Sequence, residues 1–145
     1  IKKYITDFGN EEVLNKENII VFPHVGGSTE EAELNCAIAA GQTIRRFMET
    51  GEIINSVNFP NMKQFLDAPY RITLINKNVP NIVASITTAV SELEINIDNI
   101  INRSKGDYAY TLLDLDESDE TKIAKLVEKF KATDAITKVR VIKHK

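Results

Sequence analysis

The sequence lacks tryptophan, has one cysteine, and contains no apolar run long enough to cross a membrane. A single cysteine, Cys36, cannot form an internal disulfide, so nothing indicates a disulfide-stabilised secreted domain. A membrane-spanning helix needs about 20 consecutive apolar residues, and no signal-peptide pattern opens the sequence. We therefore expect no membrane partner and a cytoplasmic location.

An excess of positive charge is also lacking, since 18 basic and 21 acidic residues give a formal net charge of -3. Nucleic-acid backbones are bound by clustered positive charge, so we expect no nucleic-acid partner. Hydrophobic residues make up 43% and charged residues 27%, which is typical of a globular protein and excludes a disordered chain. Because the sequence opens on Ile1 rather than methionine, we expect it to be a piece of a longer protein.

Two prolines divide the sequence into two regions. Pro60 and Pro69 bracket a short stretch without a clear hydrophobic period, which is typical of a connection between folded units. We therefore predict a first region over 1–60, a linker over 61–68 and a second domain over 69–145.

The first region indicates strands followed by one long helix. The apolar run over 18–22 predicts a strand buried on both faces of a parallel sheet. A capping box over 28–31 predicts the start of a helix that runs from about Glu30 to Glu49, and Gly51 supplies a stop. One helix and one or two strands cannot bury enough apolar surface to fold alone, so this region needs a partner.

The second region has the periodicity of a complete small α+β domain. Apolar spacing predicts strands over 70–75, 95–101 and 108–115, helices around 82–93 and 123–130, and a last strand around 139–141. The resulting order, β-α-β-β-α-β, is that of the ferredoxin-like fold, with an antiparallel sheet and two helices on one face.

One histidine lies where an α/β protein places its ligands. His24 follows the predicted buried strand, and Gly26 and Gly27 precede a helix N-terminus. Ligands of open α/β sheets bind at the carboxyl ends of the strands, and glycines let the backbone approach a ligand closely. A histidine exchanges protons near neutral pH. The alternative is a loop histidine beside two turn glycines.

The run Pro-His-Val-Gly-Gly-Ser-Thr-Glu-Glu-Ala over 23–32, with Ile-Asn-Ser-Val-Asn-Phe-Pro over 54–60, resembles the D-isomer-specific 2-hydroxyacid dehydrogenases. The resemblance implies that 1–60 is an α/β remnant of a dinucleotide-binding domain. It also implies that His24 is the general acid/base while a hydride passes to or from NAD. The family pairs this histidine with a glutamate, which aligns with Glu11, or with Glu12 if the loop is shifted by one residue.

The same resemblance implies that Asp7, His24, Gly26 and Gly27 face the NAD cofactor. The alternative for Asp7 is a turn or capping aspartate. The sequence has no Gly-x-Gly-x-x-Gly run, the element that holds a dinucleotide pyrophosphate. We therefore predict that the chain alone neither catalyses hydride transfer nor binds NAD tightly.

The second domain resembles an ACT domain through the runs over 76–82 and 96–97. The resemblance implies a homo-oligomer in which these domains pair side by side, with L-serine bound between them. By this resemblance Asn78 and Asn96 match effector-contacting asparagines, and Asn76 stands at a third such position, where the serine-inhibited type has a histidine. Amides suit such a ligand because they both donate and accept hydrogen bonds. The alternative is that these asparagines only cap turns.

Two other functions are open to the second domain. It could be a stand-alone ACT-type module for amino-acid binding or dimerisation. The β-α-β-β-α-β order is also that of the RNA-recognition motif, in which aromatic residues such as Tyr108 and Tyr110 would stack on bases. The acidic run over 114–120 is more typical of a helix start than of a metal loop, so we expect no metal site.

Overall fold

The computed structural model describes residues 2–144, which form two compact units divided between Ala40 and Gly41. The elements along the chain are β1 (Tyr4–Thr6), β2 (Ile19–Val21), α1 (Glu30–Thr50), β3 (Tyr70–Lys77), α2 (Ile82–Ser91), β4 (Asn96–Lys105), β5 (Tyr108–Asp116), α3 (Glu120–Lys131) and β6 (Ile136–Lys143).

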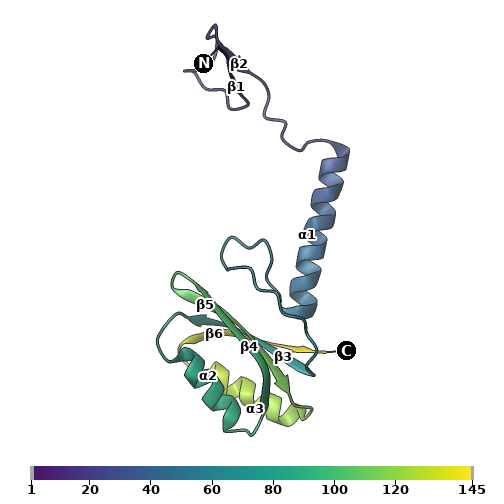
Figure 1. Cartoon of the computed structure of the whole chain (residues 1–145), viewed down its shortest axis with the longest axis vertical. Helices are drawn as coiled ribbons and strands as arrows, with labels where there is room; N and C mark the ends of the chain where they lie inside the picture. The colour runs from purple at the N-terminus through teal and green to yellow at the C-terminus, as the bar shows by residue number, and fades with distance from the viewer. Residues whose placement is uncertain (1, 145) are drawn as a thin grey trace. The chain divides into compact units, whose positions relative to one another are not determined.

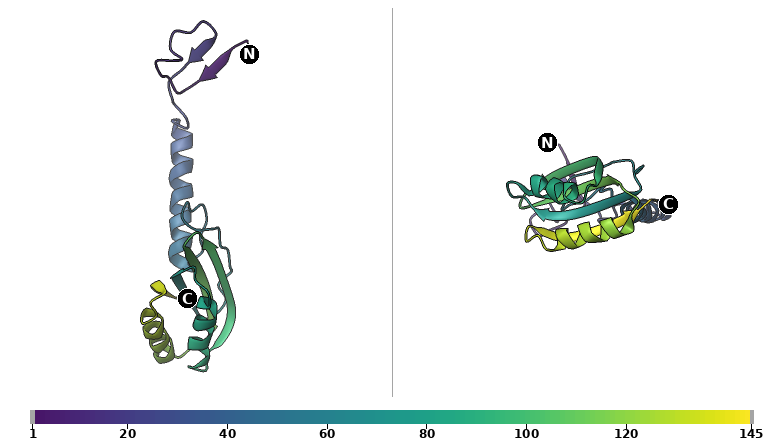
Figure 2. Two further views of the ribbon diagram at one scale, coloured as in Figure 1. Left: turned by 90° about the vertical axis from the view of Figure 1, so that its left-hand side faces the viewer. Right: turned by 90° about the horizontal axis from the view of Figure 1, so that it is seen from below.

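The second unit confirms the predicted ferredoxin-like order. Its four strands form an antiparallel sheet in the order β4-β5-β3-β6. Helices α2 and α3 lie side by side on one face of that sheet (Figure 1), and a second view shows them on the same side (Figure 2). The strands extend beyond their predicted ends, because pairing with neighbours continues past the apolar residues.

The main core lies between the sheet and the two helices. Apolar side chains of β3 and β5, among them Ile72, Leu74 and Leu113, are fully buried there. Leu126 and Phe130 of α3 pack against them with at most 1% of their surface exposed. Three- and four-residue spacing places these α3 side chains on one stripe, so the local period positions the core correctly.

The other face of the sheet is covered by the segment that follows α1. Ile53 and Met62 form an isolated antiparallel bridge, with two backbone hydrogen bonds of 3.0 and 2.8 Å. Both side chains are buried against Tyr110 and Leu112 of β5. The stretch over 61–68, predicted as a linker, is therefore packed: Met62 is 1% exposed. Pro60 and Pro69 interrupt regular secondary structure, but the residues between them still pack against the core.

The first unit contains β1, β2 and the part of α1 before Gly41. The two strands pair in parallel, with Tyr4 opposite Ile19 and Thr6 opposite Val21. A parallel strand was predicted over 18–22 and is confirmed, but the predicted burial of both its faces is wrong. Ile20 is 45% exposed, because only two strands form this sheet. The assignment of this unit to a dinucleotide-binding domain stays a prediction.

Candidate functional site

Parallel pairing of β1 with β2 brings the candidate acid/base site together. Asp7 directly follows β1, and His24 follows the end of β2 after Phe22 and Pro23. Because both strands point the same way, their carboxyl ends lie at one edge of the sheet. Asp7 Oδ2 lies 2.6 Å from His24 Nδ1.

The imidazole of His24 is held on two sides and open on the rest. Its ring centroid lies 4.6 Å from that of Phe8, at a tilt of 40°. The His24 side chain is 59% exposed and the Asp7 side chain 32%. With the Nδ1 proton donated to the carboxylate, Nε2 is the free nitrogen, able to accept a proton from a bound molecule. The geometry therefore suits general acid/base chemistry.

The partner of His24 differs from the one the family resemblance implied. Glu11 was the predicted partner, but within residues 2–144 its carboxylate makes no hydrogen bond or ion pair with His24. Glu11 stands in a turn where Asn10 Oδ1 accepts from the backbone N–H groups of Glu12 and Val13. Asp7 reaches His24 because it directly follows the end of β1, beside the end of β2.

The glycines after His24 leave room for a ligand. Gly26 has φ +44°, in the left-handed region that favours glycine, and a Cβ built there would meet nothing within 4 Å. A Cβ on Gly27 would lie 3.4 Å from that of Ala32. The Thr29 hydroxyl caps the helix by accepting from the Ala32 N–H at 3.1 Å, one residue later than the capping box predicted over 28–31. Open backbone beside His24 fits the approach of a cofactor ring, whereas nothing in the sequence supplies the pyrophosphate loop.

The loop between β3 and α2 holds the second candidate site. Asn78 ties this loop to the β4–β5 turn, because its N–H donates to Asp107 O and its side chain donates to Gly106 O. Asn81 caps α2 with φ +67° and makes no side-chain capping bond. Asn96, at the start of the edge strand β4, is exposed and stands opposite Asp116, so it lies at the other end of the sheet from Asn78. Asn78 and Asn96 therefore keep the accessibility that ligand contact requires.

Asn76 is not accessible in this way, which corrects its predicted role as a direct ligand contact. It has no exposed surface. Its Oδ1 accepts from the Thr111 hydroxyl at 3.0 Å, and its Nδ2 donates to Lys77 O at 2.9 Å. Thr111 in turn accepts from Asn102 Nδ2 at 2.7 Å. Sequence reasoning missed this chain of polar contacts, whose only signal is a threonine inside an apolar strand.

The aromatic pair considered for RNA binding is divided by burial. Tyr108 is 47% exposed, but Tyr110 is 2% exposed and donates to Gly51 O at 2.8 Å. Burial raises the pKa of the Tyr110 hydroxyl above its usual value of 10.0, so it stays a hydrogen-bond donor. A buried tyrosine cannot stack on a base, which weighs against an RNA-recognition surface.

Two features are absent from the described residues, 2–144. None of their helices is both long and apolar enough to span a bilayer. Their histidine, cysteine, aspartate and glutamate side chains form no group of three or more suited to hold a metal ion.

Comparison with known proteins shows relatives over most of the chain, although no family model matches it. It is 30% identical over 136 residues to D-3-phosphoglycerate dehydrogenase 2 of Saccharomyces cerevisiae, covering 90% of this chain and 29% of that protein. It is 25% identical to D-3-phosphoglycerate dehydrogenase of Escherichia coli strain K12, covering 87% of this chain and 30% of that protein. The chain therefore spans less than a third of these relatives.

Solved structures that match about half of the chain include ACT domains. The ACT domain from GTP pyrophosphokinase of Chlorobium tepidum is 18% identical with a TM-score of 0.46, covering 50% of this chain and 95% of that one. An ACT domain protein from Streptococcus pneumoniae is 25% identical with a TM-score of 0.43, covering 51% and 86% of the two chains.

Proposed function

Because the chain is a relative of the D-3-phosphoglycerate dehydrogenases over 90% of its length, we propose that it is part of such an NAD-dependent oxidoreductase. The reaction proposed is the conversion of 3-phospho-D-glycerate to 3-phosphohydroxypyruvate, the first step of L-serine biosynthesis. The observation that carries the proposal is the 2.6 Å contact between Asp7 and His24 at the carboxyl edge of a parallel strand pair.

The proposed chemistry assigns one proton transfer to this chain. NAD, where bound, would supply the acceptor for the hydride that leaves C2 of the substrate. His24 Nε2 accepts the proton of the C2 hydroxyl as the carbonyl forms, and returns it in the reverse direction. Asp7 holds the ring in the orientation that leaves Nε2 free and stabilises the imidazolium that forms. Gly26 leaves the backbone open beside the reacting groups.

Exposed apolar side chains support the view that the strand pair belongs to a larger sheet. Tyr4 and Ile5 of β1 are 52% and 61% exposed, and Ile20 of β2 is 45% exposed. Ile5 and Ile20 stand opposite each other in the strand register, and large exposed apolar patches mark surfaces that a partner covers. We infer that a complete enzyme covers these residues and supplies the pyrophosphate loop, so this chain alone is inactive.

The test compares the two histidines of the sequence in the intact enzyme that carries it. His24→Asn should lower kcat by about 100-fold or more, the usual contribution of a general acid/base, while NAD binding followed by fluorescence persists. His144→Asn, at the other end of the chain, should leave kcat unchanged. Full activity of the His24 variant would overturn the proposal, and turnover by the 145-residue chain alone would contradict its inactivity.

We further propose that the second unit is an ACT-type sensor that binds an amino acid, L-serine first among the candidates, and pairs with a second copy. Asn78 and Asn96 are the accessible contacts, and because they lie at opposite ends of the sheet in one copy, one ligand would take Asn78 from one copy and Asn96 from the other. The N-terminus of α2 supplies free N–H groups for a carboxylate. Asn76, which is buried, would support the end of β3 below the loop through its hydrogen bond with Thr111, without touching the ligand.

L-Serine titration followed by thermal unfolding tests this sensor. A specific ligand at 100 times its dissociation constant adds about 2.7 kcal/mol of stability. Asn78→Ala and Asn96→Ala should weaken the response at least tenfold in serine concentration, whereas Asn58→Ala, an exposed asparagine outside the proposed site, should not. A response only to another amino acid would change the effector. If none of the twenty amino acids raised the unfolding temperature, the sensor function would be overturned and a dimerisation module would remain.

A further inference from the structure

The carboxyl end of α1 is held by side chains that belong to the sheet. A helix leaves its last four carbonyl groups without intrahelical donors, and the last turn of α1 contains no basic residue. Arg140 of β6 donates to the carbonyl oxygens of Phe47, at 3.0 Å, and Met48. Tyr110 of β5 donates to Gly51 O. These donors complement the negative end of the helix dipole.

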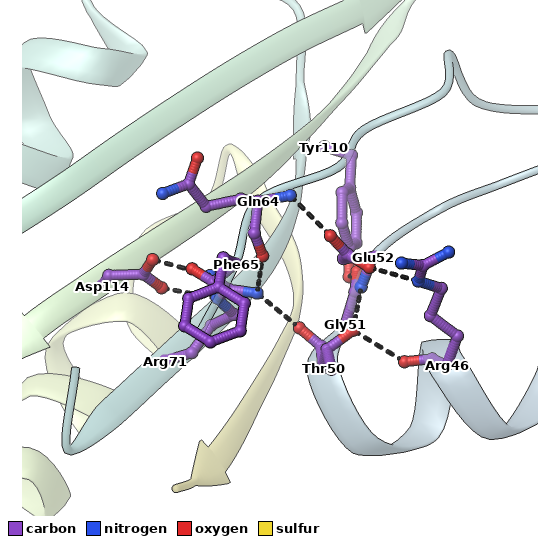
Figure 3. A network of polar contacts seen from close by, with 9 residues as sticks. All are labelled: Arg46, Thr50, Gly51, Glu52, Gln64, Phe65, Arg71, Tyr110 and Asp114. Carbon is purple, nitrogen blue, oxygen red and sulfur yellow. Dashed lines mark hydrogen bonds and ion pairs between the residues drawn. The ribbon is translucent and has the colours of Figure 1, made fainter. Parts of the chain in front are cut away.

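Arg71 of β3 is the buried centre of this arrangement (Figure 3). Its side chain has no exposed surface and makes two bonds, of 2.5 and 2.7 Å, to the carboxylate of Asp114. Three more N–H groups donate to the carbonyls of Thr50, Gln64 and Phe65, at 2.8, 2.9 and 3.1 Å. A guanidinium has five N–H donors, so all are used. We call Arg71, Tyr110 and Arg140 the α1 clamp.

One strand joins the clamp to the proposed sensor loop. Arg71 is the second residue of β3, and the same strand ends at Lys77, next to Asn78. β3 pairs with β5 at every residue, and with β6 from Tyr70 to Asn76 with a register irregularity between Ile75 and Asn76. Sliding a paired strand breaks its ladder hydrogen bonds, so β3 and its neighbours move together when the loop moves. Arg71 lies six residues before Lys77, about 20 Å away at roughly 3.3 Å per residue.

We propose that the α1 clamp is the coupling element through which an amino acid bound at the loop after β3 alters the stability of the last turn of α1. The inference rests on the proposed sensor function and adds the route by which the sensor acts on the rest of the chain. Helix α1 continues from the clamp back to Glu30, close in sequence to the His24 loop. Coupling between sites is reciprocal and measurable as a change in local stability.

Amide hydrogen exchange over residues 44–53 of the 145-residue chain, with and without saturating L-serine, tests the coupling. The expected result is a change in exchange rate of about fivefold or more on ligand binding, the lower end of ordinary coupling strengths. Arg140→Gln should keep serine affinity and lose that change, and Tyr110→Phe is a milder second variant. Arg45→Gln is the matched control, because Arg45 lies on α1 and, among residues 2–144, its side chain pairs only with Glu49 on the surface.

The outcomes separate this inference from the function on which it rests. If no amino acid stabilises the chain, the sensor function fails and the coupling fails with it. If L-serine, or another amino acid, binds but exchange over 44–53 stays constant, the coupling alone is overturned. The coupling is likewise overturned if exchange changes equally in Arg140→Gln and Arg45→Gln, since the clamp then transmits nothing.

Discussion

Asp7 Oδ2 lies 2.6 Å from His24 Nδ1, although 17 positions separate the two residues in the sequence. The contact follows from the parallel register of β1 and β2, which sets Thr6 opposite Val21 and leaves both residues just beyond the paired positions. A shift of the register by one residue would turn Asp7 to the other face of the strand pair. The geometry of the site therefore depends on the three residue pairs that join β1 to β2.

Replacing Asp7 tests which carboxylate fixes the imidazole. In the unchanged chain Asp7 accepts from Nδ1, so we expect the neutral His24 ring to carry its proton on Nδ1. In Asp7→Leu the proton should move to Nε2 in most molecules, which ¹⁵N NMR of the ring nitrogens resolves. Glu11→Leu should leave His24 unchanged, and His144 serves as the internal reference. If Glu11→Leu alters the tautomer and Asp7→Leu does not, Glu11 is the partner.

The packing of 51–68 against the sheet can be tested within one short stretch. Met62 is 1% exposed, whereas Phe65, three residues later, is 81% exposed. Met62→Ala removes buried atoms and should lower the free energy of unfolding by about 2–5 kcal/mol in urea denaturation. Phe65→Ala should change it by less than about 0.5 kcal/mol, although the residue removed is larger. Equal effects would show that this stretch is a free linker.

The ferredoxin-like order was predictable because its signals are local. Alternation in β3 and three- and four-residue spacing in α3 act over a few residues, and both elements form where predicted. The helix stop at Gly51 was predictable for the same reason: it adopts φ +71°, and its N–H donates to Phe47 O. A local period does not depend on which partner a segment later meets.

What the sequence could not predict depends on long-range pairing. Arg71 and Asp114 alternate with apolar residues, a pattern that indicates a solvent-facing side of a strand. They are buried because residues 50–65 cover that side and supply carbonyl acceptors. The His24 partner was missed similarly, since Asp7 wins over Glu11 only through the register of β1 and β2.

Two glycines with similar backbone angles separate strain from crowding. Gly51 and Gly106 have φ +71° and +65°, so alanine at either should cost about 1–2 kcal/mol of left-handed strain. At Gly51 a Cβ would also lie 2.5 Å from Thr73 Cγ2 and 3.0 Å from Ile142 Cδ1, whereas at Gly106 it meets nothing within 4 Å. Overpacking adds about 1–3 kcal/mol. Urea denaturation should therefore rank Gly51→Ala as the more destabilising, and equal losses would contradict the close approach of this turn to the sheet.

Acid should weaken the second unit through the carboxylates around the start of α3. The pKa of Glu117 lies below its ordinary 4.5, mainly because its carboxylate accepts from the backbone N–H of Asp119 and secondly because it pairs with Lys122. The pKa of Asp119 lies below its ordinary 3.8 because its carboxylate accepts from the backbone N–H of Thr121. A carboxyl with a lowered folded-state pKa stabilises the fold above its unfolded pKa, and this contribution is lost as pH falls through the folded value. We therefore expect the unfolding midpoint to fall as pH drops below about 4.5.

A double variant identifies the groups responsible for this acid sensitivity. Glu117→Gln with Asp119→Asn removes both titrations, and asparagine retains the capping geometry at the start of α3. Thermal unfolding measured from neutral pH downward should show a shallower decline for the double variant than for the unchanged chain. If the two declines coincide, these caps are not protonated in the folded state over that range. The acid sensitivity then belongs to other carboxylates, of which Glu120, beside Lys143, is the first to replace.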